Sequence, residues 1–244
     1  MVTGLPGIGY VAKLSVDYLI KELNAELFGE LYSKSFPSYV LIKKDGTVEL
    51  LKNEFYYYKN EKMNNDLIIF TGNVQAISPE GQYEVSNEVL NMAEKYKVKK
   101  LFALAAYITH KTIKKVNVYG AATEQKLLEE LKKYEISSMD AGSITGTNGL
   151  LFGLAKLRNI QSICLLSETP GYRTPSGQVL ADVKSAQALL KVLSKIVNIK
   201  IDMEPLEKEV KLSEEFNRKI EELKRQEVEK MQKDITPPPK DIYA

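Results

Sequence analysis

The residues with the clearest chemical potential lie at the end of the chain, in positions 235–244. A rigid spacer comes first, consisting of Pro237, Pro238 and Pro239. Consecutive prolines fix φ and remove backbone donors, so this stretch can neither continue a helix nor join a sheet, and it favours extended polyproline II. The chain then ends on Ile242, Tyr243 and Ala244.

Those last three residues offer an apolar side chain, an aromatic ring with a hydroxyl group, and a free carboxylate. Capture of a chain terminus in a pocket is a recognised mode of peptide binding. The pattern therefore predicts a partner-binding tail behind a spacer. The alternative reading is an uninvolved, frayed end, as most termini are.

Residue types that carry out catalysis are sparse. His110 is the only histidine, so a His-rich metal site is excluded, and a Ser-His-Asp triad would have to use that residue itself. Cys164, the only cysteine, lies in an apolar run and is expected to be a packed, inert thiol. Asp140, Glu168 and Asp182 could line a cleft, but no spacing joins them as an acid/base pair. We expect no enzyme activity, no metal and no cofactor.

Two glycine-rich turns, at residues 4–9 and 141–149, could in principle hold a phosphate. Gly7, Gly9 and Ala12 match a loose dinucleotide fingerprint, but that fingerprint requires a strand ahead of it, and only two or three residues precede the turn. Lys13 is not in the register of a phosphate-binding GK[ST] loop. We expect structural turns, with nucleotide binding as the less favoured alternative.

The elements that must position these residues alternate between strands and helices. Apolar runs predict strands at 25–32, 67–70, 100–107, 118–122 and 160–166. Amphipathic or small-faced segments predict helices at 11–23, 82–96, 124–133, 146–157 and 176–197. This order predicts a three-layer α/β domain over residues 1–205, with a parallel-dominated sheet and helices on both faces. Asp45-Gly46 predicts a hairpin over 39–51 at one edge.

Residues 206–234 change character and form a predicted helical arm. Of positions 207–234, 17 are charged, and oppositely charged pairs such as Glu214/Arg218 stand four apart in the favourable order. Leu206, Val210 and Phe216 belong to a narrow apolar stripe. The arm is expected to carry the tail, residues 235–244, away from the domain.

Composition excludes several classes of partner. The net charge is only +2, from 34 basic and 32 acidic residues, and just four of the basic residues are arginine. Neither nucleic acid nor an anionic membrane surface is therefore expected as a partner. No run is long enough for a membrane span, and a single cysteine suits a reducing, cytoplasmic location. The aromatic cluster at 55–58 has no arginine nearby, so it predicts core or subunit contact rather than base stacking.

Five segments resemble recurring segments of the proteasome assembly chaperone family. They are Gly4-Leu5-Pro6-Gly7-Ile8-Gly9, Tyr119-Gly120-Ala121-Ala122-Thr123, Gly146-Thr147-Asn148-Gly149-Leu150-Leu151, Glu168-Thr169-Pro170-Gly171-Tyr172 and Asp182-Val183-Lys184-Ser185-Ala186. They occur in order and span most of residues 1–205. The resemblance departs from the family pattern at one point, since other members have a first strand ahead of the position of Gly4. That departure puts the start of the sheet, and the stability of its edge, in doubt.

The resemblance implies a fold like that of nucleoside phosphorylases and an ATP-independent archaeal protein. It also implies a homo-oligomer, expected to be a tetramer, whose tails insert between adjacent α-subunits of the proteasome core particle. There the terminal carboxylate would meet a pocket lysine, and Tyr243 would help to open the gate. Whether the protein acts as an assembly chaperone or a gate-opening activator stays open.

Two other functional readings remain at this point. The implied fold and the glycine turns suggest a nucleoside-acting hydrolase or transferase, although fold analogy alone does not carry function. The third reading is a scaffold whose tail takes no part in binding.

Overall fold

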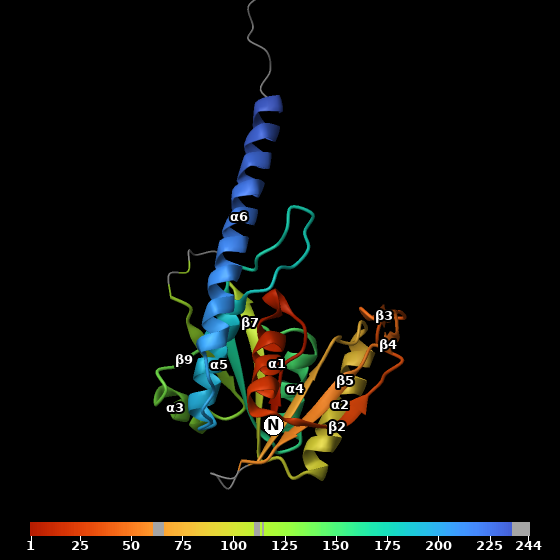
Figure 1. The fold of residues 1–244 in the computed structure, drawn as a ribbon. Helices are drawn as coiled ribbons and strands as arrows, with labels where there is room; N and C mark the ends of the chain where they lie inside the picture. The colour runs from red at the N-terminus through yellow and green to blue at the C-terminus, as the bar shows by residue number, and fades with distance from the viewer. Residues whose placement is uncertain (61–65, 110–112, 114, 236–244) are drawn as a thin grey trace, which may run out of the picture.

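The structure is a computed structural model that describes residues 1–60, 66–109, 113 and 115–235 (Figure 1). Its main sheet has eight strands in the order β2-β5-β6-β1-β7-β10-β8-β9. Their bounds are β1 (Val2–Thr3), β2 (Glu26–Leu31), β5 (Asn53–Tyr58), β6 (Leu67–Gly72), β7 (Lys100–Ile108), β8 (Val118–Ala122), β9 (Ser137–Ser138) and β10 (Gln161–Thr169). The four central strands β6, β1, β7 and β10 are mutually parallel. Antiparallel β5 and β2 follow on one side and antiparallel β8 on the other.

Helices cover both faces of this sheet. The helical elements are η1 (Ile8–Tyr10), α1 (Val11–Leu23), α2 (Pro79–Lys95), α3 (Gln125–Lys132), α4 (Gly146–Leu157), α5 (Val183–Ile196) and α6 (Glu204–Ile235). Side chains of α1, α3 and α5 share one buried cluster with the sheet, while those of α2 and α4 share the other. The predicted three-layer α/β architecture is therefore confirmed.

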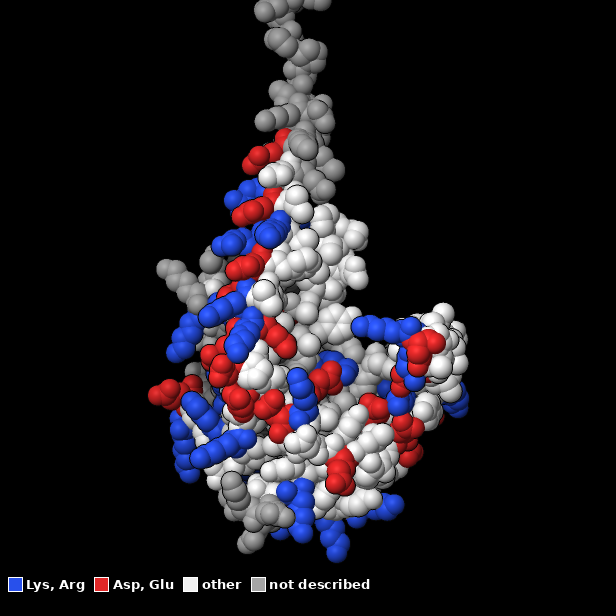
Figure 2. Space-filling model, in the orientation of Figure 1, with Lys and Arg blue, Asp and Glu red and all other residues white. Residues whose placement is uncertain are grey.

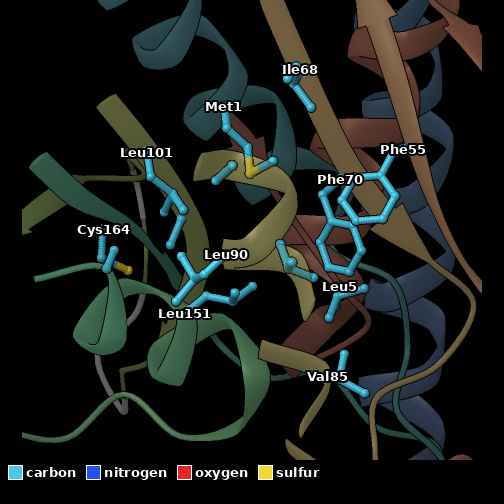
Figure 3. Close-up of a cluster of buried hydrophobic side chains, with 14 of the residues drawn as sticks. Met1, Leu5, Phe55, Ile68, Phe70, Val85, Leu90, Leu101, Leu151 and Cys164 are labelled. Carbon is cyan, nitrogen blue, oxygen red and sulfur yellow. The ribbon is translucent and has the colours of Figure 1, made fainter. Parts of the chain in front are cut away.

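The two apolar layers explain why the central strands are almost purely hydrophobic. All six residues of β6 are buried, because a parallel strand in the middle of the sheet is covered from both sides. On one face, Figure 3 shows Phe70 of β6 beside Phe55 of β5, with ring centroids 4.9 Å apart. Phe55 thus belongs to the core, as the first of the two readings of the aromatic cluster expected.

The first strand corrects an expectation drawn from the sequence. Val2 and Thr3 do form a strand ahead of Gly4, and it lies in the centre of the sheet rather than at an edge. Val2 pairs with Ile69 on one side and Phe102 on the other, and the Met1 amino group donates to the carbonyl oxygen of Lys100 at 2.8 Å. A strand of two residues suffices here because both neighbouring strands and both helical layers hold it. Since β1 is central, its shortness does not weaken an edge of the sheet.

Two helices begin at positions different from those expected. Helix α2 starts at Pro79, three residues early, because the Ser78 hydroxyl accepts from the Gly81 amide at 3.1 Å and caps the first turn. Helix α5 starts at Val183 rather than 176, because the Asp182 carboxylate accepts from the Ser185 amide at 3.0 Å. Residues 176–180, which the sequence predicts as the start of this helix, instead belong to a short hairpin over 172–180.

The predicted hairpin at 39–51 is confirmed as a separate two-stranded sheet of β3 (Val40–Ile42) and β4 (Val48–Leu50). Gly46 adopts φ of 82° in its turn, the left-handed conformation that Asp-Gly was expected to provide. Leu41 packs towards the core, whereas the opposite side of the hairpin is exposed.

Candidate partner-binding site

The candidate site is the helical arm α6 together with the helical layer of α1 and α5 from which it departs. Helix α6 has 32 residues, which corresponds to about 48 Å at 1.5 Å per residue. Figure 1 shows it lying along the α5 side of the domain and then continuing beyond the domain. Pro205 is its second residue, where a missing backbone donor disrupts no helical hydrogen bond.

The first turns of α6 are fastened to the domain by apolar contacts. Leu206 and Val210 are buried, and Leu206 belongs to the cluster beneath α1 and α5. Just before the helix, the Tyr18 hydroxyl donates to the carbonyl oxygen of Asp202 at 2.7 Å. These contacts join α1, α5 and the start of α6, and they set the direction in which the arm leaves.

Ion pairs add to this attachment on the surface. Lys184 and Lys191 of α5 contact Glu214 and Glu207 of α6 at 2.6 and 3.3 Å. Exposed pairs of this kind contribute at most about 1 kcal/mol, so the buried aliphatic residues dominate. The sequence predicts that Glu214 pairs with Arg218, whereas in the structure the Glu214 carboxylate contacts Lys184 of α5.

A hairpin over 172–180 stands beside the middle of α6. The Leu180 amide donates to the Tyr172 carbonyl oxygen at 2.9 Å. Within the hairpin, the Arg173 guanidinium donates to the Gly177 carbonyl oxygen at 3.0 Å. Between this hairpin and α6 is a hollow of about 570 Å³ lined by Tyr172 and by residues of α6. Burial, with smaller effects from Asp182, Glu214 and Glu221, raises the pKa of Tyr172.

Beyond these contacts α6 is solvated. Figure 2 shows positive and negative side chains interspersed along the face of the arm in view. Leu212, Phe216 and Leu223 form an exposed apolar stripe on the same helix. The chain is thereby carried to Ile235, the first residue of the predicted tail.

The model of the PAC2 family matches residues 1–224. The chain belongs to the PAC2 family. A curated relative, an uncharacterised protein of Methanocaldococcus jannaschii, is 38% identical over 240 residues, covering 98% of this chain and 88% of that protein.

Two solved structures similar to this PAC2 chain are proteasome-related proteins of one archaeon. PbaB of Pyrococcus furiosus, an archaeal proteasome activator, is 37% identical with a TM-score of 0.82, covering 90% of this chain and 92% of that one. PbaA of the same organism, an archaeal homologue of proteasome-assembly chaperone, is 28% identical with a TM-score of 0.74, covering 96% and 91%. The family resemblance inferred from the five sequence segments is therefore confirmed.

The residues predicted to bind a partner are not themselves placed by the structure. Ile242, Tyr243 and Ala244, with the spacer Pro237 to Pro239, lie outside the described residues, as does His110. The structure locates the helix that leads to the tail. The docking role of these residues stays a prediction.

Two of the three acidic residues singled out in the sequence, Glu168 and Asp182, have structural partners in this PAC2 fold. The Glu168 carboxylate accepts from the Asn117 side chain at 2.9 Å and from the Tyr119 hydroxyl at 3.0 Å. The Asp182 carboxylate accepts from the hydroxyls of Thr169 and Ser185 at 2.6 and 2.7 Å. Each carboxylate thus fixes a loop at the end of β10.

Asp140 lies exposed. In the part of the chain that the structure describes, no group of three or more His, Cys, Asp or Glu is placed to hold a metal. Nor is any helix there long and apolar enough to cross a bilayer.

The two glycine turns, treated separately in the sequence, lie side by side in the fold. The Gln75 side chain joins them, since its amide nitrogen donates to the Pro6 carbonyl oxygen and its oxygen accepts from the Thr147 amide at 2.7 Å. Gly4 has a packing role, because a β-carbon there would lie 2.5 Å from the Ala12 carbonyl oxygen. Sequence reasoning missed Gln75, which stands in no motif and follows β6 as an ordinary loop residue.

Proposed function

We propose that this PAC2 protein is an ATP-independent, cytoplasmic proteasome-binding chaperone or activator. Its tails dock into pockets between α-subunits of the proteasome core particle and aid either assembly or gate opening. The observation that carries the proposal is the arm α6, which leads the chain away from a domain similar to PbaB and ends where the Pro-rich spacer begins.

The anchoring of α6 supports this role physically. Because Leu206 and Val210 hold its first turns, the arm leaves the domain in a defined direction. A defined direction reduces the conformational freedom that docking must remove, which favours binding. The spacer of three prolines extends this restriction to the tail residues.

Several tails on one oligomer would strengthen weak single contacts. Once one tail is bound, the others act at a high effective concentration, provided that the arms can reach neighbouring pockets. A homo-oligomer, for which a tetramer is expected, therefore belongs to the proposal. The apolar outer side of the β3–β4 hairpin supplies a surface suited to such association.

The proposal is tested by capture of purified archaeal proteasome core particles on immobilised protein. The intact chain and a variant lacking residues 236–244 are compared, together with a variant carrying Leu157→Lys on the exposed end of α4 as a surface control. We expect the intact chain and the control to retain core particles and the tail-deleted variant to lose them. Equal capture by the tail-deleted variant would favour the scaffold reading.

A further inference from the structure

A second possible site is a hollow of about 560 Å³ at the carboxyl ends of the central strands. Its walls are mostly small or apolar, and the principal ones are Gly7, Ile8, Ala106, Ile108, Ile144 and Leu166. Pockets of about 300–1,000 Å³ with mainly apolar walls are the usual size for small-molecule sites. None of these residues belongs to the arm or the tail.

The topology explains why a hollow forms at this place. After β1 the chain enters α1 on one face of the sheet, whereas after the neighbouring β6 it enters α2 on the other face. Where adjacent parallel strands connect to opposite faces, a crevice opens beyond their carboxyl ends, and α/β proteins bind ligands there. The lining residues Ile8 and Gln75 follow those two strands.

Hydrogen bonds brace the walls in advance of any ligand. Gln75 bridges the two glycine turns, as described above, and the Asn148 side chain both accepts from and donates to the backbone of Leu5, at 3.1 and 3.3 Å. The amide groups of both side chains are therefore engaged within the protein. A ligand would meet a preformed hollow with few side-chain amides free to bind sugar hydroxyls.

The charges of the lining narrow the ligand class. Among the described residues that line the hollow, the single charged side chain is Asp140, and neither lysine nor arginine is present. A phosphate or carboxylate group would enter without a counter-charge, which is unfavourable. Asp140, Ser143 and Thr145 are exposed and give the hollow a polar mouth above an apolar interior.

We propose that this hollow binds a neutral, largely apolar small molecule, and that it does not bind nucleotides or nucleosides. The proposal goes beyond proteasome binding and does not depend on the tail. The apolar area that such a ligand would bury supplies the driving force.

The test uses the full-length protein and the neutral fluorescent probe N-phenyl-1-naphthylamine. We expect saturable fluorescence enhancement with one site per chain, undiminished by adenosine or ATP. Absence of saturable binding, or displacement of the probe by adenosine or by ATP, would overturn the proposal. Saturable binding of ATP or NAD itself would favour the enzyme reading.

A filling variant identifies the site. Gly7 is extended, with φ of −164°, and a β-carbon there would meet nothing nearer than the Leu5 carbonyl oxygen at 3.9 Å. Gly7→Phe should therefore preserve the fold while occupying the hollow, and weaken probe binding about tenfold or more. Gly153→Phe is the matched control, since a β-carbon at that exposed helical position meets nothing within 4 Å. Equal binding by both variants would contradict the assignment.

A measurement on the parent protein guards against misfolding of the variant. Isoleucine methyl spectra should show shifts at Ile8, Ile108 and Ile144 upon addition of the probe, because these residues line the hollow. Ile42 and Ile77 are highly exposed, lie outside the lining, and serve as internal controls. Shifts confined to Ile42 or Ile77 would show adsorption on exposed apolar surface and overturn the proposal.

Discussion

At the scale of single residues, Cys164 is the sharpest test of the core. Its thiol is fully buried in β10, and burial raises its pKa to about 12. At pH 8 only about one thiol in ten thousand would then be ionised. A reagent would therefore find neither access to the sulfur nor a reactive thiolate. We expect no reaction with Ellman's reagent in the native protein up to pH 9 and full reaction in urea. Rapid native labelling would show that the β10 layer opens readily.

The surroundings of individual side chains were only partly predictable from the sequence. The burial of Cys164 is confirmed, and it was predictable because an apolar run surrounds the residue. The partners of Glu168 and Asp182 were not, since Asn117, Tyr119 and Thr169 lie 13 to 51 residues away in sequence from the carboxylates that they contact. Only the fold brings such groups together, and no local pattern records it.

At the scale of elements, the direction of the arm depends on its first turns. Leu206→Ala should lower the free energy of unfolding by about 2 kcal/mol, because it leaves a cavity beneath α5. The amides of α6 should also lose protection in hydrogen exchange. Leu212→Ala, on the same helix but with a side chain 68% exposed, should change stability by less than about 0.5 kcal/mol. Equal protection of α6 in the two variants would contradict the proposed anchoring.

The elements themselves were largely predictable, and the misplaced helix ends have local causes. Apolar runs located β6, β7 and β10, because central strands are buried on both faces. The expected start of α5 at residue 176 is wrong for a local reason. Gly177 adopts φ of 87°, which is not helical, and the capping residue Asp182 comes only after this glycine. Turn chemistry prevailed there over apolar periodicity.

At the scale of the whole molecule, the exposed side of the β3–β4 hairpin is a candidate for self-association. Val40 faces Leu50 and Ile42 faces Val48 across the strands, and all four side chains are exposed. Such a contiguous apolar face on a short, two-stranded sheet is unusual without a partner. The sequence predicts core or subunit contact for the aromatic cluster 55–58, and Phe55 of that cluster faces the core.

We expect light scattering to show an oligomer of the 27.5 kDa chain at micromolar concentration, with or without residues 236–244. The double variant Ile42→Lys, Val48→Lys should shift it towards the monomer, because burying two charges opposes association. Leu157→Lys, at an exposed apolar residue on α4, should not. A monomeric parent, or an unchanged mass in the double variant, would refute the assigned surface.

The overall architecture followed from the order of elements, whereas the position of β1 did not. A two-residue strand carries no periodicity, and its place between β6 and β7 becomes evident only when the whole sheet is assembled. The tail is predicted from its prolines and its terminal residues alone, and its docking role stays a prediction. Its partner could be inferred only through family resemblance, because no pattern within one chain specifies the pocket of another.

The most direct test of the account is the binding of Tyr243 variants to proteasome core particles, with hydrolysis of a short fluorogenic peptide measured in parallel. Tyr243→Ala should lose about 2 kcal/mol per engaged tail, as for other aromatic anchors, and Tyr243→Phe about 1 kcal/mol. Residues appended after Ala244 should be as damaging as Tyr243→Ala, because they displace the carboxylate. Circular dichroism should be unchanged throughout. If Tyr243→Ala binds core particles and stimulates hydrolysis as well as the parent does, the tail is not the docking element and the central claim is wrong.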